Sequence, residues 1–382
     1  MHVLHVIPSI DLAHGGPQSV LAGLAPAQVA AGLRVSVLAT RRAGEDVALA
    51  DRLRGAGVAV ELVGPATGPL RRHPALESVV RAGVASADVV HVHALWEEIQ
   101  HQAARSAERA GVPFLVTPHG MLDPWSLSQS RWKKRLYLAW RLRRNLRTAR
   151  ALHFTTRTES DLAAPLELGP AAFVETLGVD LTEFERLPRR GAFRDRYELG
   201  ERPLVLFLGR VHPKKGLDLL VPAFADAQLD GATLAIAGPD ADGYRAKVEA
   251  DVAARGLTDR VLFTGMLRGR DRIAALADAD LFVLPSYQEN FGIAVVEALA
   301  SGTPVVISDQ VNIWQEISEA SVGGIVKTDV TSVTNELRRW MTDPALRHAA
   351  AERARPFVWQ RYDWRQIAGR WVGHYARIAD RR

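Results

Sequence analysis

The sequence predicts an α/β protein that consists of two successive doubly wound domains. A length of 382 residues suits two domains of ordinary size. Short runs rich in valine, isoleucine and leucine alternate with longer alanine-rich segments along the whole chain. This alternation weakens once, between about residues 177 and 201, and then starts again. Alternating strands and helices are typical of a parallel sheet covered on both faces, so two such sheets are expected.

Strands of the first domain are expected at short apolar runs, several of them bounded by glycine, proline or aspartate. These runs are residues 2–8, 33–39, 58–63, 88–93, 113–117 and 151–155. The alanine-rich segments between them predict helices, among them 17–31, 72–86 and 97–110. Together these elements predict an N-terminal domain of residues 1–185.

The second domain is expected at residues 186–362, with a polar linker at 187–191. Its strands are expected at 203–208, 232–237, 260–264, 280–284 and 304–307. The tail 363–382 has apolar residues at helical spacing, which predicts a helix that packs back on the first domain. Doubly wound sheets bind ligands at the carboxyl ends of their strands, so the two domains are expected to face each other across a ligand cleft.

The composition excludes several classes of protein. There is no cysteine, which excludes a disulfide scaffold, a thiolate metal site and a cysteine nucleophile. A net charge of +5 over this length is too small to indicate nucleic-acid binding. The sequence shows no export signal and no run of about 18 apolar residues. We expect a cytoplasmic protein, with peripheral contact to the inner face of the membrane as an additional hypothesis.

The most informative motif follows the expected strand 280–284. A loop carries Glu289, and a helix is expected to begin near Gly292 and to end at Gly302. The N-terminus of that helix would offer unpaired backbone N–H groups and a partial positive charge, which suit a phosphate. Glu297 lies more than one turn inside the helix, so the two carboxylates would reach different parts of one extended ligand.

A basic loop follows the expected strand 203–208, at residues 209–216. Within it, Arg210 offers a bidentate fork and Lys215 a point charge, a combination suited to a diphosphate. Either motif alone is common on protein surfaces. Their joint position after two strands of one domain predicts a phosphate-binding site with carboxylates beside it.

These motifs together resemble those of glycosyltransferase family 4, whose members are retaining enzymes with the GT-B architecture of two Rossmann-like domains. The resemblance is carried mainly by Glu289-x7-Glu297, by the segment 298–305 that follows, and by Gly209-Arg210-x4-Lys215-Gly216. Further matches are residues 237–239 and 261–265 in the second half, and 15–17 and 117–120 in the first. The family implies an acceptor-binding N-terminal domain and a nucleotide-sugar-binding C-terminal domain.

The resemblance implies how a nucleotide-sugar donor would be bound. Arg210 and Lys215 would hold the diphosphate and stabilise the departing nucleotide. Glu297 would hydrogen-bond the ribose, and Glu289 would contact hydroxyls of the transferred sugar. The other implied donor contacts are backbone groups: those of Phe291, Gly292 and Ile293 at the sugar and phosphate, and those of Gly265 and Met266 at the base.

The first domain would complete the site. Gly16 would let the backbone approach the phosphate because it has no Cβ, and His119 would project from the end of the strand 113–117 towards the sugar. The catalytic set that the family implies is therefore His119, Arg210, Lys215 and Glu289. For the acceptor, we consider His93 as a lining residue and Trp125 as a stacking platform, with ordinary packing as the alternative for each.

No metal and no other cofactor is expected. His91 and His93 share one face of a strand and would suit a metal by spacing alone, but no third ligand is evident from the sequence. The two Asp-x-Asp triplets, at 240–242 and 278–280, are expected to be structural, the first as a helix cap. Arg210 and Lys215 would neutralise the phosphate charge that Mg²⁺ would otherwise neutralise.

The segment 131–150 is rich in arginine and lysine, and no acid occurs between Asp123 and Glu159. One interpretation is a core helix whose long cations are solvated. The other is a patch for anionic lipid or for a lipid-diphosphate acceptor.

The expected function is that of a metal-independent, retaining hexosyltransferase. It would move a sugar from a UDP- or GDP-sugar to a hydroxyl of a glycan or lipid-linked glycan in cell-envelope polysaccharide synthesis. The alternatives are a GT-B sugar-nucleotide epimerase and a silent sugar-nucleotide-binding module. A nicotinamide oxidoreductase is excluded because the first strand leads into residues 11–16 without G-x-G-x-x-G spacing. The oligomeric state is not predicted.

Overall fold

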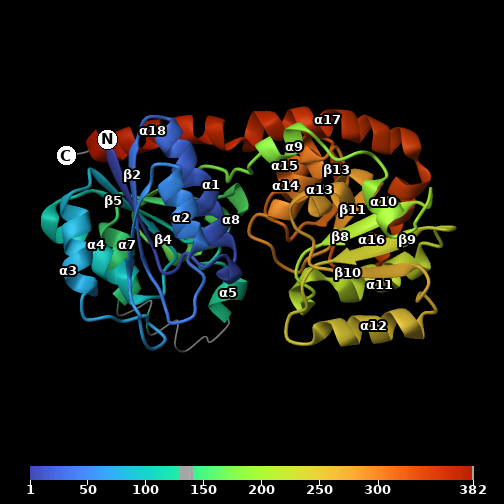
Figure 1. Cartoon of the computed structure of the whole chain (residues 1–382), viewed down its shortest axis with the longest axis horizontal. Coiled ribbons are helices and arrows are strands. Elements are labelled where there is room, and N and C mark those ends of the chain that lie inside the picture. The colour runs from blue at the N-terminus through green and yellow to red at the C-terminus, as the bar shows by residue number, and fades with distance from the viewer. Residues whose placement is uncertain (129–136, 138–140, 381–382) are drawn as a thin grey trace. The chain divides into compact units, whose positions relative to one another are not determined.

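The chain divides into two compact units (Figure 1). The computed structural model describes residues 1–128, 137 and 141–380, with Trp125 described only in its backbone. The first unit comprises Met1–Gly178 together with the C-terminal tail from Trp364, and the second comprises Val179–Asp363.

The first unit is built on one parallel sheet in the order β3-β2-β1-β4-β5-β6-β7. Six of its strands lie where the apolar runs predict them, and the edge strand β7 was not predicted because it is short and mostly exposed. The strands are β1 (His2–Ile7), β2 (Arg34–Thr40), β3 (Ala59–Val63), β4 (Val89–His93), β5 (Phe114–Thr117), β6 (Ala151–Phe154) and β7 (Ala171–Val174).

Helices connect these strands and cover the sheet. They are α1 (Gly16–Ala30), α2 (Ala48–Gly55), α3 (Leu76–Ala85), α4 (Glu98–Ala110), α5 (Pro124–Ser128), α7 (Arg143–Thr148), α8 (Arg157–Ala163) and α18 (Trp364–Asp380), with short 3-10 turns η1 (Leu12–His14) and η3 (Ala164–Leu166). The helix α18 packs along α1, although about 330 residues separate them in the sequence. Trp371 and Tyr375 of α18 are fully buried, so this C-terminal helix completes the core of the first unit.

The second unit contains a second parallel sheet in the order β10-β9-β8-β11-β12-β13. Its first five strands agree with the predicted runs. The strand β13 was missed because it begins with two glycines, which weaken a strand pattern. The strands are β8 (Leu204–Leu208), β9 (Thr233–Ala237), β10 (Val261–Gly265), β11 (Leu281–Leu284), β12 (Val305–Ser308) and β13 (Gly323–Val326).

Helices also surround the second sheet. They are α9 (Thr182–Glu185), α10 (Ala192–Arg196), α11 (Leu217–Asp226), α12 (Tyr244–Ala254), α13 (Gly269–Asp278), α14 (Ile293–Ala300), α15 (Trp314–Glu319), α16 (Val330–Thr342) and α17 (Pro344–Tyr362), with the 3-10 turn η4 (Pro213–Lys215). Both predicted Asp-x-Asp triplets are structural here. Asp278 accepts hydrogen bonds from the N–H groups of Gly191, just before α10, and of Phe193 in its first turn, and Asp240 accepts from Arg245 N–H at the start of α12.

The boundary between the units falls earlier than the expected position after residue 185. Val179 N–H donates to the carbonyl of Tyr362 at 2.8 Å, and the Arg355 guanidinium donates to the carbonyl of Phe184 at 3.1 Å. Both partners belong to α17, so the segment containing α9 is part of the second unit. These contacts join residues more than 170 positions apart, and local composition does not encode them.

Each sheet has one position at which the strand order reverses. It lies between β1 and β4 in the first unit and between β8 and β11 in the second. At such a switch point the loops that follow the two strands run in opposite directions and leave a crevice at the carboxyl edge. The predicted glycine-rich segment, basic loop and Glu289 loop all follow one of these four strands, and His119 follows the neighbouring strand β5.

Candidate active site

In the second unit, the loops after β8 and β11 meet at the switch point. Lys215, from the turn η4, forms an ion pair with the carboxylate of Glu289, 74 positions further along the chain. Both side chains are largely but not fully buried, with 15% and 21% of their surfaces exposed. The two residues that the sequence placed at separate strand ends therefore form one charged pair that a ligand can reach.

Close backbone packing holds the two loops together. Gly216 has a left-handed backbone (φ +72°), and a Cβ there would collide with the carbonyl oxygen of Pro285. Beside this contact, Tyr287 N–H donates to the carbonyl of Lys214 at 2.9 Å. Glycine is therefore required after Lys215 for two reasons: the sign of φ and the approach of the neighbouring loop.

Replacing Gly216 by alanine is expected to lower the free energy of unfolding by about 1–3 kcal/mol more than replacing Gly231. Gly231 also has a left-handed backbone (φ +63°), but a Cβ there would meet no atom within 4 Å. Both variants strain a left-handed backbone, but only the one at Gly216 also creates a steric collision, so their difference measures the collision. Urea denaturation of both variants measures the difference, and equal losses would contradict the close packing of the two loops.

Arg210 lies two residues after β8 and is exposed. No ion pair or hydrogen bond engages its guanidinium among the residues that the structure describes. A bidentate cation at the switch point is thus available to an anionic ligand.

The start of α14 presents the backbone groups predicted to line a sugar phosphate. Gly292 caps the helix with a left-handed backbone (φ +80°), and Ile293 is the first helical residue, as expected. The Phe291 side chain is buried edge-on against Tyr362, so only its backbone is available to a ligand. The Glu289 loop is held by its own backbone as well, because Glu289 N–H donates to the carbonyl of Gln310 at 3.0 Å.

Glu297 is buried inside α14, and its carboxylate lies 3.1 Å from the Arg272 guanidinium. Burial raises the pKa of Glu297 to about 7, although Arg272 acts in the opposite direction, and Glu183 adds to the increase. Glu183 also pairs with Arg272, at 2.5 Å. Sequence reasoning missed Arg272 because it lies on a different helix, α13, with no local motif around it.

The residues expected at the base lie at the end of β10. Gly265 has a left-handed backbone (φ +69°), and the following Met266 is 56% exposed. The carbonyl of Gly265 already accepts from Gly238 N–H at 2.8 Å and from the Thr264 hydroxyl at 2.9 Å, so at this turn the exposed Met266 offers a ligand mainly an apolar side chain.

In the first unit, the glycine-rich segment forms the entry to α1. Gly15 caps the helix with φ +105°, and Gly16 is the first residue of α1. A Cβ at Gly16 would meet no atom within 4 Å, so no described protein contact requires glycine there. The proposed reason for Gly16, close approach of a phosphate, therefore depends on the ligand alone.

His119 lies just after β5 and has a left-handed backbone (φ +53°), which is uncommon for a residue other than glycine. The turn is fixed by Glu159, whose buried carboxylate accepts from Gly120 N–H at 2.5 Å and from Thr155 at 2.7 and 2.8 Å. Glu159 was not predicted. The spacing Thr156-x-x-Glu159, which marks a helix start, was the available signal.

His93 is packed inside the first unit, which agrees with the second of the two interpretations considered for it rather than with lining an acceptor site. It is 1% exposed, and its ring nitrogens bond His5 at 2.9 Å and His119 at 3.0 Å. His91 and His93 share a face as predicted, but the third histidine that the sequence did not reveal is His5, on the neighbouring strand β1. Ring nitrogens of these three residues lie within 4.8 Å of one another.

Two further predictions fall partly outside the described residues. The side chain of Trp125 is not described, and of the basic segment 131–150 the structure describes Tyr137 and 141–150. In that part, Arg141 pairs with Glu98 at 2.9 Å and Arg144 with Glu108 at 3.3 Å. These two cations are bound to α4.

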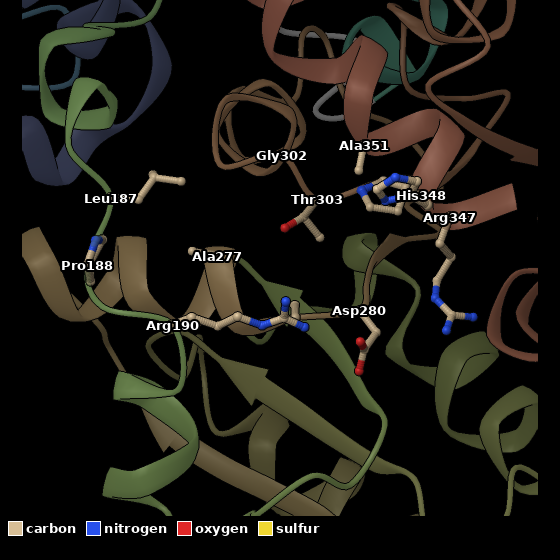
Figure 2. Close-up of a pocket in the computed structure, with 12 residues that line it drawn as sticks. Leu187, Pro188, Arg190, Ala277, Asp280, Gly302, Thr303, Arg347, His348 and Ala351 are labelled. Carbon is tan, nitrogen blue, oxygen red and sulfur yellow. The ribbon is translucent and has the colours of Figure 1, made fainter. Parts of the chain in front are cut away.

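A hollow of about 380 Å³ lies at the other edge of the second sheet (Figure 2). Asp280 and Thr303 line it, immediately before β11 and β12 begin. Lys215 and Glu289 lie beyond the carboxyl ends of their strands and do not line this hollow. Since doubly wound sheets bind ligands at their carboxyl edge, we do not assign the hollow to a nucleotide.

Comparisons with known proteins agree with this geometry. Residues 190–357 match the family of glycosyl transferases group 1, and residues 15–178 match the glycosyl transferase 4-like domain. The phosphatidyl-myo-inositol mannosyltransferase of Mycobacterium leprae is 30% identical over 390 residues, which cover 96% of this chain and 94% of that protein. The alpha-D-kanosaminyltransferase of Streptomyces kanamyceticus is 30% identical over 248 residues, or 63% of each chain.

Among solved structures, the crystal structure of Anabaena Alr3699/HepE in complex with UDP and glucose has a TM-score of 0.79 at 20% identity and covers 99% of this chain and 100% of that one. Two doubly wound units with loops of this kind at their switch points define a GT-B protein. The chain belongs to the group 1 glycosyltransferases, of the family 4 type. None of the helices in the described part of the chain is long and apolar enough to span a bilayer.

Proposed function

We propose that this protein is a retaining hexosyltransferase that moves a sugar from a nucleotide diphosphate donor to a hydroxyl of a glycan or lipid-linked glycan. The observation that carries the proposal is the Lys215–Glu289 pair at the switch point of the second sheet. Arg210, which has no partner among the described residues, and the start of α14 belong to the same two loops. The arrangement offers two cations and backbone N–H groups to a diphosphate, and a carboxylate to sugar hydroxyls.

The chemistry of the transfer suits these groups. Breaking the anomeric C–O bond puts negative charge on the diphosphate and positive charge on the sugar carbon. Arg210, Lys215 and the start of α14 would stabilise the negative charge, which is commonly the largest electrostatic contribution to such a reaction. In the retaining route that the family implies, the leaving phosphate accepts the proton of the acceptor hydroxyl on the face from which it departs.

Glu289 is better suited to binding the sugar than to acting as a nucleophile. Its carboxylate is already paired with Lys215, which would reduce its nucleophilicity. The second carboxylate, Glu297, is buried in α14 and paired with Arg272, which does not favour a two-carboxylate mechanism. We also propose that no metal takes part, because Arg210 and Lys215 would supply the positive charge at the phosphates.

The acceptor is proposed to be a glycan or a lipid-linked glycan of the cell envelope. The name of the mycobacterial relative, phosphatidyl-myo-inositol mannosyltransferase, supports a lipid-borne hydroxyl as the acceptor. For the donor we propose a UDP- or GDP-sugar, and the UDP in the Anabaena structure supports the first.

A thermal-shift screen with UDP, GDP, ADP and dTDP is expected to single out one nucleotide by a rise in Tm. A ligand at 100 times its Kd stabilises the folded state by about 2.7 kcal/mol. Arg210→Ala should reduce this rise, whereas Arg190→Ala, an exposed arginine at the hollow of the opposite edge, should leave it unchanged. Equal shifts with all four nucleotides, or equal effects of the two variants, would contradict the site.

Product analysis separates the proposed transfer from the alternatives. Incubation with the identified nucleotide sugar alone should leave it intact or slowly hydrolysed, and an added glycan or lipid-linked acceptor should be glycosylated with the anomeric configuration of the donor. Conversion of the donor into a second nucleotide sugar would instead indicate an epimerase. Donor binding with neither hydrolysis nor transfer would indicate a silent binding module.

A further inference from the structure

A continuous chain of hydrogen-bonded side chains runs along the face of the first sheet that α1 and α18 cover. It draws on β1, β4, β5, β6 and both helices. Every member is buried except His119, which is partly exposed at one end. In order, the chain consists of His119, His93, His5, Gln28, Tyr375, His91, Thr117, His153 and the main-chain carbonyl of Glu175.

The inner end of the chain determines the direction of the hydrogen bonds, because a carbonyl oxygen can only accept. His153 Nε2 must therefore donate to the carbonyl of Glu175 at 2.8 Å, and its Nδ1 accepts from the Thr117 hydroxyl at 2.8 Å. Thr117 has then used its one proton, so it accepts from His91 Nε2 at 2.7 Å. His91 Nδ1 in turn accepts from the Tyr375 hydroxyl at 2.8 Å.

Gln28 carries this direction into the second half of the chain. The Tyr375 hydroxyl has donated its proton, so it accepts from the amide nitrogen of Gln28 at 3.0 Å. The amide oxygen of Gln28 then faces His5 Nε2 at 2.7 Å, and this nitrogen must donate. His5 Nδ1 accepts from His93 Nε2 at 2.9 Å, and His93 Nδ1 accepts from His119 Nε2 at 3.0 Å.

His119 is thereby left with its proton on Nε2 and a lone pair on Nδ1. Among the described residues, Nδ1 of His119 has no hydrogen-bond partner. This assignment of donors and acceptors requires every imidazole ring to carry one proton and therefore to be neutral. Burial favours the neutral form, because it lowers the pKa of His119 to about 3 and that of His5 to about 4. Burial also holds the pKa of His93 well below its ordinary value, so all three rings are neutral near pH 7.

We propose that Gln28 is a positioning residue that sets the tautomer of His119 through His5 and His93, so that Nδ1 can accept a hydrogen bond but cannot donate one. A ligand group at this position must then be a donor, and a sugar hydroxyl fits. Only this identification of the partner as a sugar hydroxyl rests on the proposed function. The chain ends at a main-chain carbonyl, which cannot take up a proton, so it holds one tautomer and does not relay protons.

A metal is the competing occupant of the cluster. The ring nitrogens of His5, His91 and His93 lie close enough for shared coordination. Each of these nitrogens is already matched to a protein partner, donor to acceptor, and a cation would have to displace the hydrogen bond of every nitrogen that it coordinated. The void beside the chain measures about 10 Å³, about the size of one water molecule, so a sugar could reach the chain only at its outer end.

Nitrogen NMR of the full-length protein, labelled with ¹⁵N-histidine, tests the tautomer without any assumption about function. Long-range ¹H–¹⁵N correlations at pH 7 distinguish a protonated ring nitrogen from a bare one, and a His119→Gln spectrum assigns the signals. The expected result is one neutral form of His119, with Nε2 protonated and Nδ1 bare. A wild-type His119 protonated on Nδ1 would overturn the proposal, as would zinc chloride that shifts the signals of His5, His91 and His93 together at stoichiometric addition.

Variants then test the link to the ligand. Gln28→Met removes both hydrogen bonds at similar volume and should give mixed tautomers of His119 with a fall in donor kcat/KM of about tenfold, the effect of one hydrogen bond. Thr117→Val removes the hydroxyl that passes this direction from His153 to His91, so it should also give mixed tautomers of His119, and an unchanged tautomer in this variant would contradict a direction set at the Glu175 carbonyl. If Gln28→Met changes the tautomer of His119 but not kcat/KM, Gln28 does set the tautomer, and the proposed contact between His119 Nδ1 and a sugar hydroxyl is wrong. If Gln28→Met does not fold, the wild-type spectrum still decides the tautomer.

Discussion

Replacing Lys215 by alanine is expected to reduce kcat/KM for the nucleotide sugar by about 10²–10³-fold. The ammonium group is held in place by Glu289 and lies where two switch-point loops meet, so the leaving diphosphate would lose a preorganised cation. Steady-state kinetics with the donor identified by the thermal-shift screen measures the effect. The loss should appear largely in kcat, since the charge on the diphosphate grows as the C–O bond breaks.

Lys214→Ala is the matched control for this prediction. Lys214 lies in the same turn and is linked to the neighbouring loop through its backbone carbonyl, which the substitution retains. We expect it to change kcat/KM by less than about tenfold. Equal losses in the two variants would show that the turn as a whole matters, rather than the ammonium group of Lys215, and would remove the support for the assigned site.

Glu297 is expected to make the second unit less stable as the pH rises from 4.5 to 7. The folded state holds the proton of this carboxyl up to about pH 7, whereas the unfolded chain releases it near pH 4.5. Between these values the folded state therefore binds more protons, and stability falls with increasing pH. The shift corresponds to about 3 kcal/mol, lost progressively over this window and fully absent above it.

Glu297→Gln should remove this component of the pH dependence. Urea denaturation at pH 4.5 should give similar stability for the variant and the wild type, since both side chains are then neutral. At pH 8 the variant should be more stable by about 3 kcal/mol. Donor binding should also weaken, because the proposed contact to the ribose would lose its carboxylate acceptor. Stability curves that run parallel from pH 4.5 to 8 would show that Glu297 ionises normally inside α14.

A buried acid that costs stability above pH 7 is consistent with a role in binding. Arg272 and Glu183 adjust the charge of Glu297, and neither belongs to a motif that the sequence reveals. A core packed only for stability would have placed an apolar residue at this position of α14.

Strand positions could be predicted from local pattern, with two exceptions. The run Leu281–Leu284 is apolar throughout, as a strand buried on both faces must be. The start of α14 was also predictable, since Gly292 precedes an apolar helical run. Strands β7 and β13 were not, because an exposed edge and a pair of glycines remove the apolar run on which the prediction depends.

The site was predictable to the extent that its chemistry lies in local motifs. Arg210 and Lys215 follow one strand, Glu289 follows another, and the rule for doubly wound sheets was enough to expect them together. The environment of His119 was not predictable. It combines His5 from β1, Gln28 from α1 and Tyr375 from a helix at the end of the chain.

The doubly wound class, the two-domain organisation and the charged loops at the switch points were therefore predictable from the amino-acid sequence, since they follow from periodicity and from residue type at strand ends. The partners of the buried ionisable groups, in contrast, depend on the tertiary structure. Two such cases are Glu297, which lies beside Arg272, and His119, which lies at the end of a directed chain of hydrogen bonds. The physical reason is that pKa and tautomer depend on burial and on neighbours in space, and these neighbours lie up to 347 positions apart in the chain.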